Sequence, residues 1–260
     1  MKAPIKDADF GKTAEDYLTH RAGFPNSLFE RFNQLALIQS GQRVLDLGTG
    51  TGTLGRGFAV RDCQVTGLDP SAAMIEAAKT IDADQGLNTS YVIAPSEKTG
   101  LPDNSFELVT AGQCWHWFDA EAASIEIQRL LVPGGKLIVA YYDWLPLNGN
   151  MVRRTEELIE SYNPAWRAGN LTGIHPGLFR DLGENGFRNI ESFSYDEPAV
   201  YTHESWRGRI RASAGVAATL SYEETARFDA ELAELLKKDF PESPTEVPHR
   251  VFAVIADQPA

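Results

Sequence analysis

The stretch Val44-Leu45-Asp46-Leu47-Gly48-Thr49-Gly50-Thr51-Gly52 joins a short apolar run to an acid and three alternating glycines. The apolar run predicts a buried strand over residues 43–47, because strands covered on both faces of a parallel sheet need not alternate. The glycines then allow a sharp turn and the close approach of a ligand to the backbone. Apolar residues at helical spacing follow from Leu54 to Val60. The order strand, glycine turn, helix predicts a site for a nucleotide-like ligand at the carboxyl edge of an open α/β sheet.

Two acids bear on which nucleotide-like ligand this turn holds. Residues 50–55 formally match the dinucleotide pattern G-x-G-x-x-G, which is a weak signal by itself. Asp46 opposes a pyrophosphate and favours a cation, and neither Lys nor Arg lies between Gly48 and Gly55. Asp69 ends a second strand about twenty residues on, the usual place for an acceptor of ribose hydroxyls. These features favour S-adenosylmethionine over NAD, and an NAD-dependent oxidoreductase is kept as an alternative.

Four motifs follow one another along the chain: residues 44–52, Gly67-Leu68-Asp69-Pro70-Ser71, residues 101–109 (LPDNSFELV) and residues 130–137 (LLVPGGKL). Together they closely resemble the class I S-adenosylmethionine-dependent methyltransferases. The resemblance covers roughly residues 10–142 and is nearest to the small-molecule enzymes of the ubiquinone/menaquinone and trans-aconitate types. It implies an α/β fold, a Rossmann-like sheet of seven mostly parallel strands flanked by helices. The implied strand order is 3-2-1-4-5-7-6, with an N-terminal helical cover.

The resemblance also implies which residues surround S-adenosylmethionine. The acid and the glycines of the first motif would shape the methionine end, and the acid of the second motif would bind the ribose. An N-terminal helix would fold over the cofactor, although a surface Arg and a packing Tyr explain that segment equally well. The family often has Asp-Ala-Glu after the third strand, where this chain has Pro-Ser-Glu, so adenine recognition is assigned to the backbone there. The expected cofactor-binding residues are Tyr17, Arg21, Asp46, Gly48, Gly50, Gly52, Asp69, Pro70, Met74, Ser96, Glu97 and Gln113.

The run Gly112-Gln113-Cys114-Trp115-His116-Trp117-Phe118 follows an expected fourth strand over residues 106–111. In the family, the end of this strand lies beside the methyl donor. Methyl transfer from a sulfonium is a direct displacement, so the protein mainly aligns the nucleophile and excludes water. His116 is the candidate catalytic base, because an unperturbed imidazole with a pKa near 6.5 can take a proton at neutral pH. The alternative is that His116 only lines an aromatic wall.

Aromatic and basic residues suggest the chemistry of the acceptor. Trp115, Trp117, Trp144 and Trp166 are expected to bind it, since flat rings suit an aromatic or otherwise planar molecule. On a helix, Arg207 and Arg211 share one face and Arg209 points elsewhere. One of these arginines could pair with a carboxylate or phenolate of the substrate, and Arg209 is the one assigned to it. The alternatives are tryptophans that fill the core and a solvated helix face.

Composition narrows the class of protein. The chain has 260 residues, a net charge of −12 and a pI near 4.9, which argues against nucleic-acid and anionic-membrane surfaces. Cys63 and Cys114 indicate neither a disulfide framework nor a metal site. We expect a single domain over residues 1–260 with a core of about 27–142 and 186–257 and a lid of about 145–180. Cytoplasmic localisation and a monomer or homodimer are expected.

The distal part of the chain has weaker patterns. They predict a sixth strand over residues 190–201, helices over 203–220 and 222–238, and a final strand over 247–256. The whole sequence therefore predicts transfer of a methyl group from S-adenosylmethionine to a small organic acceptor. A non-catalytic module of the same fold that binds the cofactor or a metabolite is the second alternative.

Overall fold

The computed structural model describes residues 23–166, 169 and 171–259. Its main sheet has seven strands in the order β3-β2-β1-β4-β5-β9-β6, which is the expected order 3-2-1-4-5-7-6 when they are counted along the chain. The Rossmann-like fold is therefore confirmed. The strands are β1 (Arg43–Leu47), β2 (Gln64–Asp69), β3 (Ser90–Ile93), β4 (Phe106–Gly112), β5 (Leu131–Trp144), β6 (Arg188–Asp196) and β9 (His249–Asp257).

The first five strands are parallel, and β9 runs antiparallel to both β5 and β6. Consequently β1, β2, β4 and β5 end at the same edge of the sheet. The register shifts between Phe106 and Leu108 opposite the Pro133-Gly134-Gly135 turn, so this predicted turn is an irregularity within β5. The acids and the aromatic run that the sequence singles out lie at the shared carboxyl edge.

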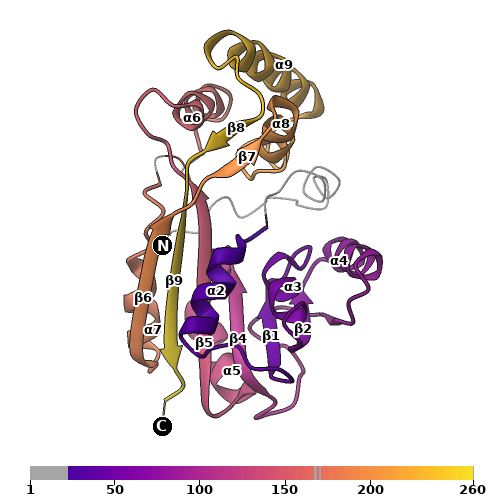
Figure 1. Cartoon of the computed structure of the whole chain (residues 1–260), viewed down its shortest axis with the longest axis vertical. Helices are drawn as coiled ribbons and strands as arrows, with labels where there is room; N and C mark the ends of the chain where they lie inside the picture. The colour runs from indigo at the N-terminus through magenta and orange to yellow at the C-terminus, as the bar shows by residue number, and fades with distance from the viewer. Residues whose placement is uncertain (1–22, 167–168, 170, 260) are drawn as a thin grey trace.

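Helices cover both faces of the sheet (Figure 1). The pleat sends Val44 into the core cluster beneath α2 (Asn26–Gln34) and α3 (Thr53–Ala59), and Leu45 into the cluster on the other face. That second cluster includes residues of α5 (Ala120–Leu130) and α7 (Gly177–Glu184). Another helix, α4 (Ala72–Asp84), packs against β2 and β3, and the Ser71 side chain caps its first turn.

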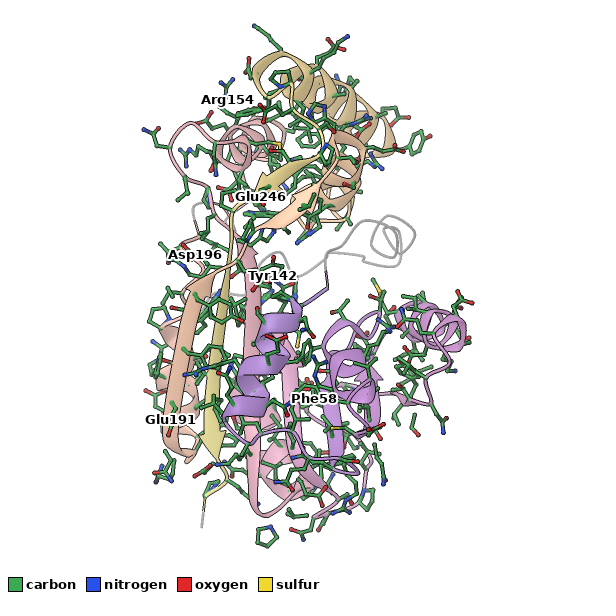
Figure 2. The ribbon with its side chains drawn as sticks, in the orientation of Figure 1. Phe58, Tyr142, Arg154, Glu191, Asp196 and Glu246 are labelled. Atoms are coloured by element: carbon green, nitrogen blue, oxygen red, sulfur yellow. The ribbon has the colours of Figure 1, made fainter. Side chains whose placement is uncertain are left out.

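A second group of elements sits beyond the carboxyl edge of β5, which we call the cap cluster (Figure 1). It contains the helices α6 (Met151–Tyr162), α8 (His203–Arg211) and α9 (Tyr222–Asp239). The two-stranded sheet of β7 (Ala199–Tyr201) and β8 (Thr245–Val247) completes it. In Figure 2, Tyr142 marks the junction with the main sheet, and Arg154 and Glu246 lie within the cap cluster.

The cap cluster corrects two sequence predictions. The expected strand over 190–201 divides into β6 and β7 around Pro198, which has no N–H to continue the main-sheet ladder. The expected helix over 203–220 ends at Arg211, and the chain then turns so that Gly215 packs tightly against Ile159 and Trp166. The segment expected as a lid supplies α6, while the other elements come from residues 199–247. Its movement as a lid stays a prediction.

Among the described residues, none of the helices is both long enough and apolar enough to cross a membrane.

Candidate active site

The glycine loop has a backbone that other residues adopt only with strain. Gly48, Gly50 and Gly52 have φ angles of 60°, 56° and 83°, in the left-handed region that favours glycine. A Cβ at Gly48 would lie 2.9 Å from both Cβ and Sγ of Cys114. The loop from β1 to α3 is therefore held tightly against the loop after β4, with no side chain on its glycines to block a ligand.

Asp46, in β1 directly before the glycine loop, anchors this loop through hydrogen bonds. Its side chain is 1% exposed and accepts hydrogen bonds from Thr49 Oγ1 at 2.6 Å, Thr110 Oγ1 at 2.7 Å and the Gly55 N–H at 3.0 Å. Burial raises the pKa of Asp46 to about 6, and these donors oppose the rise. Asp46 thus ties the loop to β4 and to α3. Its predicted attraction for a ligand's ammonium group stays a prediction.

Asp69 sits beside the glycine loop at the end of β2. Its Oδ2 accepts the Gly50 N–H at 2.9 Å, and its Oδ1 accepts the Ser71 N–H at 2.9 Å. Burial raises the pKa of Asp69 above its ordinary value, and the two backbone donors oppose the rise. Each carboxylate oxygen has a second acceptor position, so two vicinal hydroxyls can still bind.

A brace of three side chains, centred on the buried Asp82, supports the loop and was missed by sequence reasoning. Arg56 of α3 pairs with Asp82 of α4 at 2.8 Å and also donates to the Thr51 carbonyl at 2.8 Å. The Tyr91 hydroxyl of β3 donates to the other oxygen of Asp82 at 2.7 Å. The three side chains come from separate elements, so no local motif marks them. The brace fixes the glycine loop relative to α4 and β3.

The residues expected around an adenine lie on two segments next to the loop. Met74 is in the first turn of α4 and is 4% exposed, while Pro70 before that helix is exposed. Ser96 is buried after β3, and Oε1 of the adjacent Glu97 accepts the Asp119 N–H at 3.0 Å. Glu97 therefore connects the β3 loop to the start of α5. Contact of these residues with an adenine stays a prediction.

The loop after β4 is bound to strands on both sides. Gln113 has a φ of 56°, its N–H donates to the Ala140 carbonyl at 2.9 Å, and its Nε2 donates to the Tyr142 carbonyl. The Cys114 thiol donates to the Leu47 carbonyl at 3.1 Å. These contacts join β1, β4 and β5 at their carboxyl ends. They hold the loop that carries His116 next to the glycine loop.

His116 lies in a short 3-10 helix, Trp115–Trp117, and faces a group of buried polar residues. Its Nδ1 is 3.4 Å from the Tyr141 hydroxyl. The Tyr141 ring stacks on His175 with centroids 3.7 Å apart, and His175 Nε2 lies 2.6 Å from Asp143 Oδ2. Burial raises the pKa of Tyr141 well above its ordinary range, so this phenol stays neutral. Sequence reasoning missed Tyr141 and Asp143, because they lie inside an apolar strand.

The four tryptophans assigned to the acceptor have different environments. Trp115 and Trp166 are 2% and 5% exposed within the two core clusters, so their positions support ordinary packing. Trp117 is 36% exposed next to His116. Trp144 ends β5, and its Nε1 donates to Glu156 Oε1 at 2.9 Å. Contact of any of these rings with an acceptor stays a prediction.

The three arginines of α8 divide as their spacing predicts. Arg207 and Arg211 both pair with Asp229 of α9, Arg211 at 2.6 Å. Arg209 points elsewhere, and its guanidinium carbon lies 4.7 Å from the centroid of the Trp144 ring. Arg209 therefore faces the junction between the cap cluster and the main sheet. Tyr17 and Arg21, expected over the cofactor, lie outside the described residues, and their contacts stay predictions.

The known proteins that this chain resembles are methyltransferases. A model of the methyltransferase domain matches residues 45–139. An uncharacterized methyltransferase of Schizosaccharomyces pombe is 27% identical over 228 residues, which are 85% of this chain and 84% of that protein. A ubiquinone/menaquinone biosynthesis C-methyltransferase of Psychromonas ingrahamii is 29% identical over 65% of this chain and 76% of its own length. The chain spans about half the length of an uncharacterized methyltransferase of Mycobacterium tuberculosis, with 32% identity over 128 residues.

Solved structures show the same fold. A structure of a putative type II methyltransferase from Anaeromyxobacter dehalogenans covers 92% of this chain and 97% of its own, with a TM-score of 0.59 and 21% identity. A phosphoethanolamine N-methyltransferase of Haemonchus contortus, solved with phosphomonomethylethanolamine and S-adenosylhomocysteine, has a TM-score of 0.58 and 20% identity. It covers 98% of this chain and 61% of its own.

Proposed function

Because the chain belongs to the class I S-adenosylmethionine-dependent methyltransferases, we propose that it methylates a small organic acceptor. One observation carries the proposal: the glycine loop and the loop of His116 touch at the carboxyl edge of the sheet. The Cys114 thiol donates to the Leu47 carbonyl at 3.1 Å, directly before the first glycine of the loop. A ligand in the glycine loop and an acceptor beside His116 would therefore be neighbours, as direct displacement requires.

The residues of the loop fit S-adenosylmethionine. Bound there, this cofactor supplies a methyl group that is already activated by its sulfonium. The glycines carry no side chain that would block a ligand from the backbone. Substitution is disfavoured at Gly48 and Gly52, because an added Cβ would collide with or crowd neighbouring side chains. Asp69 keeps an acceptor position on each oxygen for ribose hydroxyls. The ionised form of Asp46 beneath the loop supplies negative charge, which favours a cationic ligand.

The same residues argue against a dinucleotide. A pyrophosphate at the glycine turn needs positive charge or free N–H groups. The Gly50 N–H is already bound by Asp69 at 2.9 Å. Arg56, the nearest cation along the chain, is held by Asp82 and by the Thr51 carbonyl. With Asp46 below and Asp69 beside it, the loop favours a sulfonium over two phosphates.

His116 is proposed to orient the acceptor or to remove its proton. A base needs a free lone pair, so the tautomer that suits this role has Nδ1–H donating to the Tyr141 oxygen and leaves Nε2 unprotonated. The distance of 3.4 Å is long for such a bond. Catalytic hydrogen bonds often tighten only when a substrate is bound. The Tyr141 hydroxyl then acts as the group that sets the orientation of the imidazole.

Turnover on a panel of small acceptors, with His116→Gln beside the wild type, tests this proposal. We expect kcat to fall by about 10²- to 10⁴-fold in His116→Gln, the usual contribution of a general base. The affinity for S-adenosylhomocysteine should stay within about twofold, because this substitution leaves the glycine loop intact. His203→Gln on α8, where the ring binds the Phe240 carbonyl, is the matched control and should keep the wild-type kcat.

Two outcomes would contradict the proposal in different ways. An unchanged kcat in His116→Gln would make His116 a wall of the pocket. Binding of S-adenosylmethionine without turnover of any acceptor in the panel would favour the alternative, a module of this fold that binds the cofactor and does not use it.

A further inference from the structure

We propose that the acceptor carries a carboxylate, held by Arg209 and Tyr201 at the junction between the cap cluster and the main sheet. This inference rests on the proposed function, since it names the substrate class of the same site. It concerns α8, β7 and the end of β5.

Arg209 differs from the two other arginines of its helix. Arg207 and Arg211 share the carboxylate of Asp229, whereas no Asp or Glu among the described residues lies within 4.0 Å of the Arg209 guanidinium. Arg209 is nonetheless only partly exposed, and burial lowers its pKa while the nearby Tyr201 and Asp143 act against that shift. A guanidinium stays charged in proteins, and removing it from water without an anionic partner costs free energy. An anion from outside would offset that cost.

The hydroxyl of Tyr201 is a second buried polar group at this junction. Tyr201 is 3% exposed, and its hydroxyl forms no hydrogen bond of ordinary geometry with any described residue. Native structures rarely leave such buried groups unsatisfied. Tyr201 and Arg209 contact the same pair of indoles, because the Tyr201 ring packs against Trp206, Trp206 packs against Trp144, and Arg209 lies over Trp144. A phenol donor and a guanidinium together match the two oxygens of a carboxylate.

The surroundings hold the guanidinium in place and favour a single negative charge. Trp144 supports Arg209 from one side, with its ring centroid 4.7 Å from the guanidinium carbon. His249, stacked near Tyr201, has its pKa lowered to about 4 by burial, so it adds no positive charge at neutral pH. Two carboxylates lie in the same junction: Asp143 directly precedes Trp144 and binds His175, and Glu156 accepts a hydrogen bond from the Trp144 indole. A dianion such as a phosphate monoester would be repelled more strongly than a carboxylate.

The site also lies close to the residues proposed for chemistry. Asp143 joins the two groups, because it binds His175 and directly precedes Trp144, whose ring lies against Arg209. His175 stacks on Tyr141, whose hydroxyl contacts His116. A small acceptor bound through its carboxylate at Arg209 would therefore extend toward His116. In this arrangement Arg209 selects the substrate, and the glycine loop binds the cofactor.

Calorimetric titration of the protein loaded with S-adenosylhomocysteine tests the proposal. The probes are benzoate and crotonate, with benzamide as the neutral counterpart of benzoate. We expect at least one carboxylate to bind the wild type and benzamide to bind at least about tenfold more weakly. Arg209→Gln should weaken carboxylate binding by at least about tenfold, and Tyr201→Phe by a smaller factor. Arg207→Gln, which removes the same charge two residues away, should stay within about twofold of the wild type.

Three results would overturn the proposal: equal binding of benzamide and benzoate, equal carboxylate binding by Arg209→Gln and wild type, or no binding of either carboxylate. Arg209→Lys, which keeps the charge without the planar fork, should retain part of the affinity and guards against misfolding of Arg209→Gln. The affinity for S-adenosylhomocysteine separates this proposal from the proposed function. It should be unchanged in every variant, and its absence in the wild type would contradict the methyltransferase function whatever the carboxylates do.

Discussion

The two halves of the candidate site are built in opposite ways. On the cofactor side, Asp46, Asp69 and Asp82 each accept two or more hydrogen bonds from neighbouring groups in the protein. On the acceptor side, Arg209 forms no ion pair with a described Asp or Glu, and the buried Tyr201 hydroxyl forms no hydrogen bond of ordinary geometry with a described residue. The acids of the first half are hydrogen-bonded within the protein, whereas the second half leaves donors that a ligand can satisfy.

This difference follows from what each half binds. A cofactor common to a whole family can be bound by a loop whose shape is the same before and after binding. Such preorganisation limits the entropy lost on binding. An acceptor that varies between enzymes is met by side chains on elements that the common fold does not fix. Function therefore resides in the site and not in the fold. Substitutions in the cofactor half should therefore lower the free energy of unfolding more than substitutions in the acceptor half.

Removal of the brace should give the largest effect. Asp82 is 3% exposed, and Asp82→Asn would leave the largely buried Arg56 guanidinium without its counter-ion. We expect the free energy of unfolding to fall by about 3 to 5 kcal/mol, as for other broken buried ion pairs. Chemical denaturation measures this change. The affinity for S-adenosylhomocysteine should fall as well, because Arg56 also holds the Thr51 carbonyl.

The matched substitution on the acceptor side is Arg209→Gln. It removes a charge that has no ionic partner in the described chain, so we expect a change within about 1 kcal/mol, mainly the loss of the contact with Trp144. Similar losses for Asp82→Asn and Arg209→Gln would remove the contrast between the two halves.

A substitution in the glycine loop should have the next largest effect. Gly48→Ala places a Cβ at a φ of 60° and 2.9 Å from Cys114. We expect a loss of about 2 to 3 kcal/mol in the free energy of unfolding, the sum of backbone strain and overpacking. Gly86→Ala is the control for strain alone, because Gly86 has a φ of 67° and nothing within 4 Å of the added Cβ. It should cost about 1 kcal/mol and leave cofactor affinity unchanged.

The pH dependence of stability should have opposite signs in the two halves. Asp46, with a pKa raised to about 6, binds a proton more tightly in the folded chain, so its contribution is present at low pH and is lost as the pH rises toward 6. His249, with a pKa lowered to about 4, contributes above pH 6.5 and loses that contribution as the pH falls. Between pH 4.5 and 6 each contribution changes by about 1 to 2 kcal/mol and largely cancels the other.

Single substitutions should reveal the cancellation. Relative to the wild type, the stability of Asp46→Asn should rise with pH over this interval, and that of His249→Gln should fall. Denaturation curves at several pH values measure both slopes. Parallel profiles for the two variants would mean that burial does not shift these groups as described.

The sequence predicted the cofactor half well because its parts are local. The glycine loop, Asp46 and the helix that follows lie within twenty residues, and hydrophobic patterns place β1 and β2 around them. The strand order came from the resemblance and is confirmed. The brace of Arg56, Asp82 and Tyr91 was missed, since a contact between three separate elements has no periodicity that a single sequence can reveal.

The acceptor half could be predicted only in part. The i, i+4 spacing separated Arg209 from its two neighbours, and the structure confirms that division. The buried positions of Trp115 and Trp166 were not predictable, because an aromatic residue in a loop fits a core and a pocket equally well. Tyr201 lies at the end of β7 and His249 at the start of β9. Only tertiary packing brings them to the site, so the sequence could not predict their positions there.

The central claim is that the glycine loop and Asp69 form a pocket for S-adenosylmethionine. Calorimetric titration of the wild type with S-adenosylhomocysteine and NAD, beside Asp69→Ala, tests it most directly. We predict binding of S-adenosylhomocysteine and not NAD, and a loss of at least about tenfold in Asp69→Ala, which removes acceptors for the ribose. Asp84→Ala, at an exposed position of α4, should bind like the wild type. Binding of NAD, or unchanged affinity in Asp69→Ala, would contradict the account.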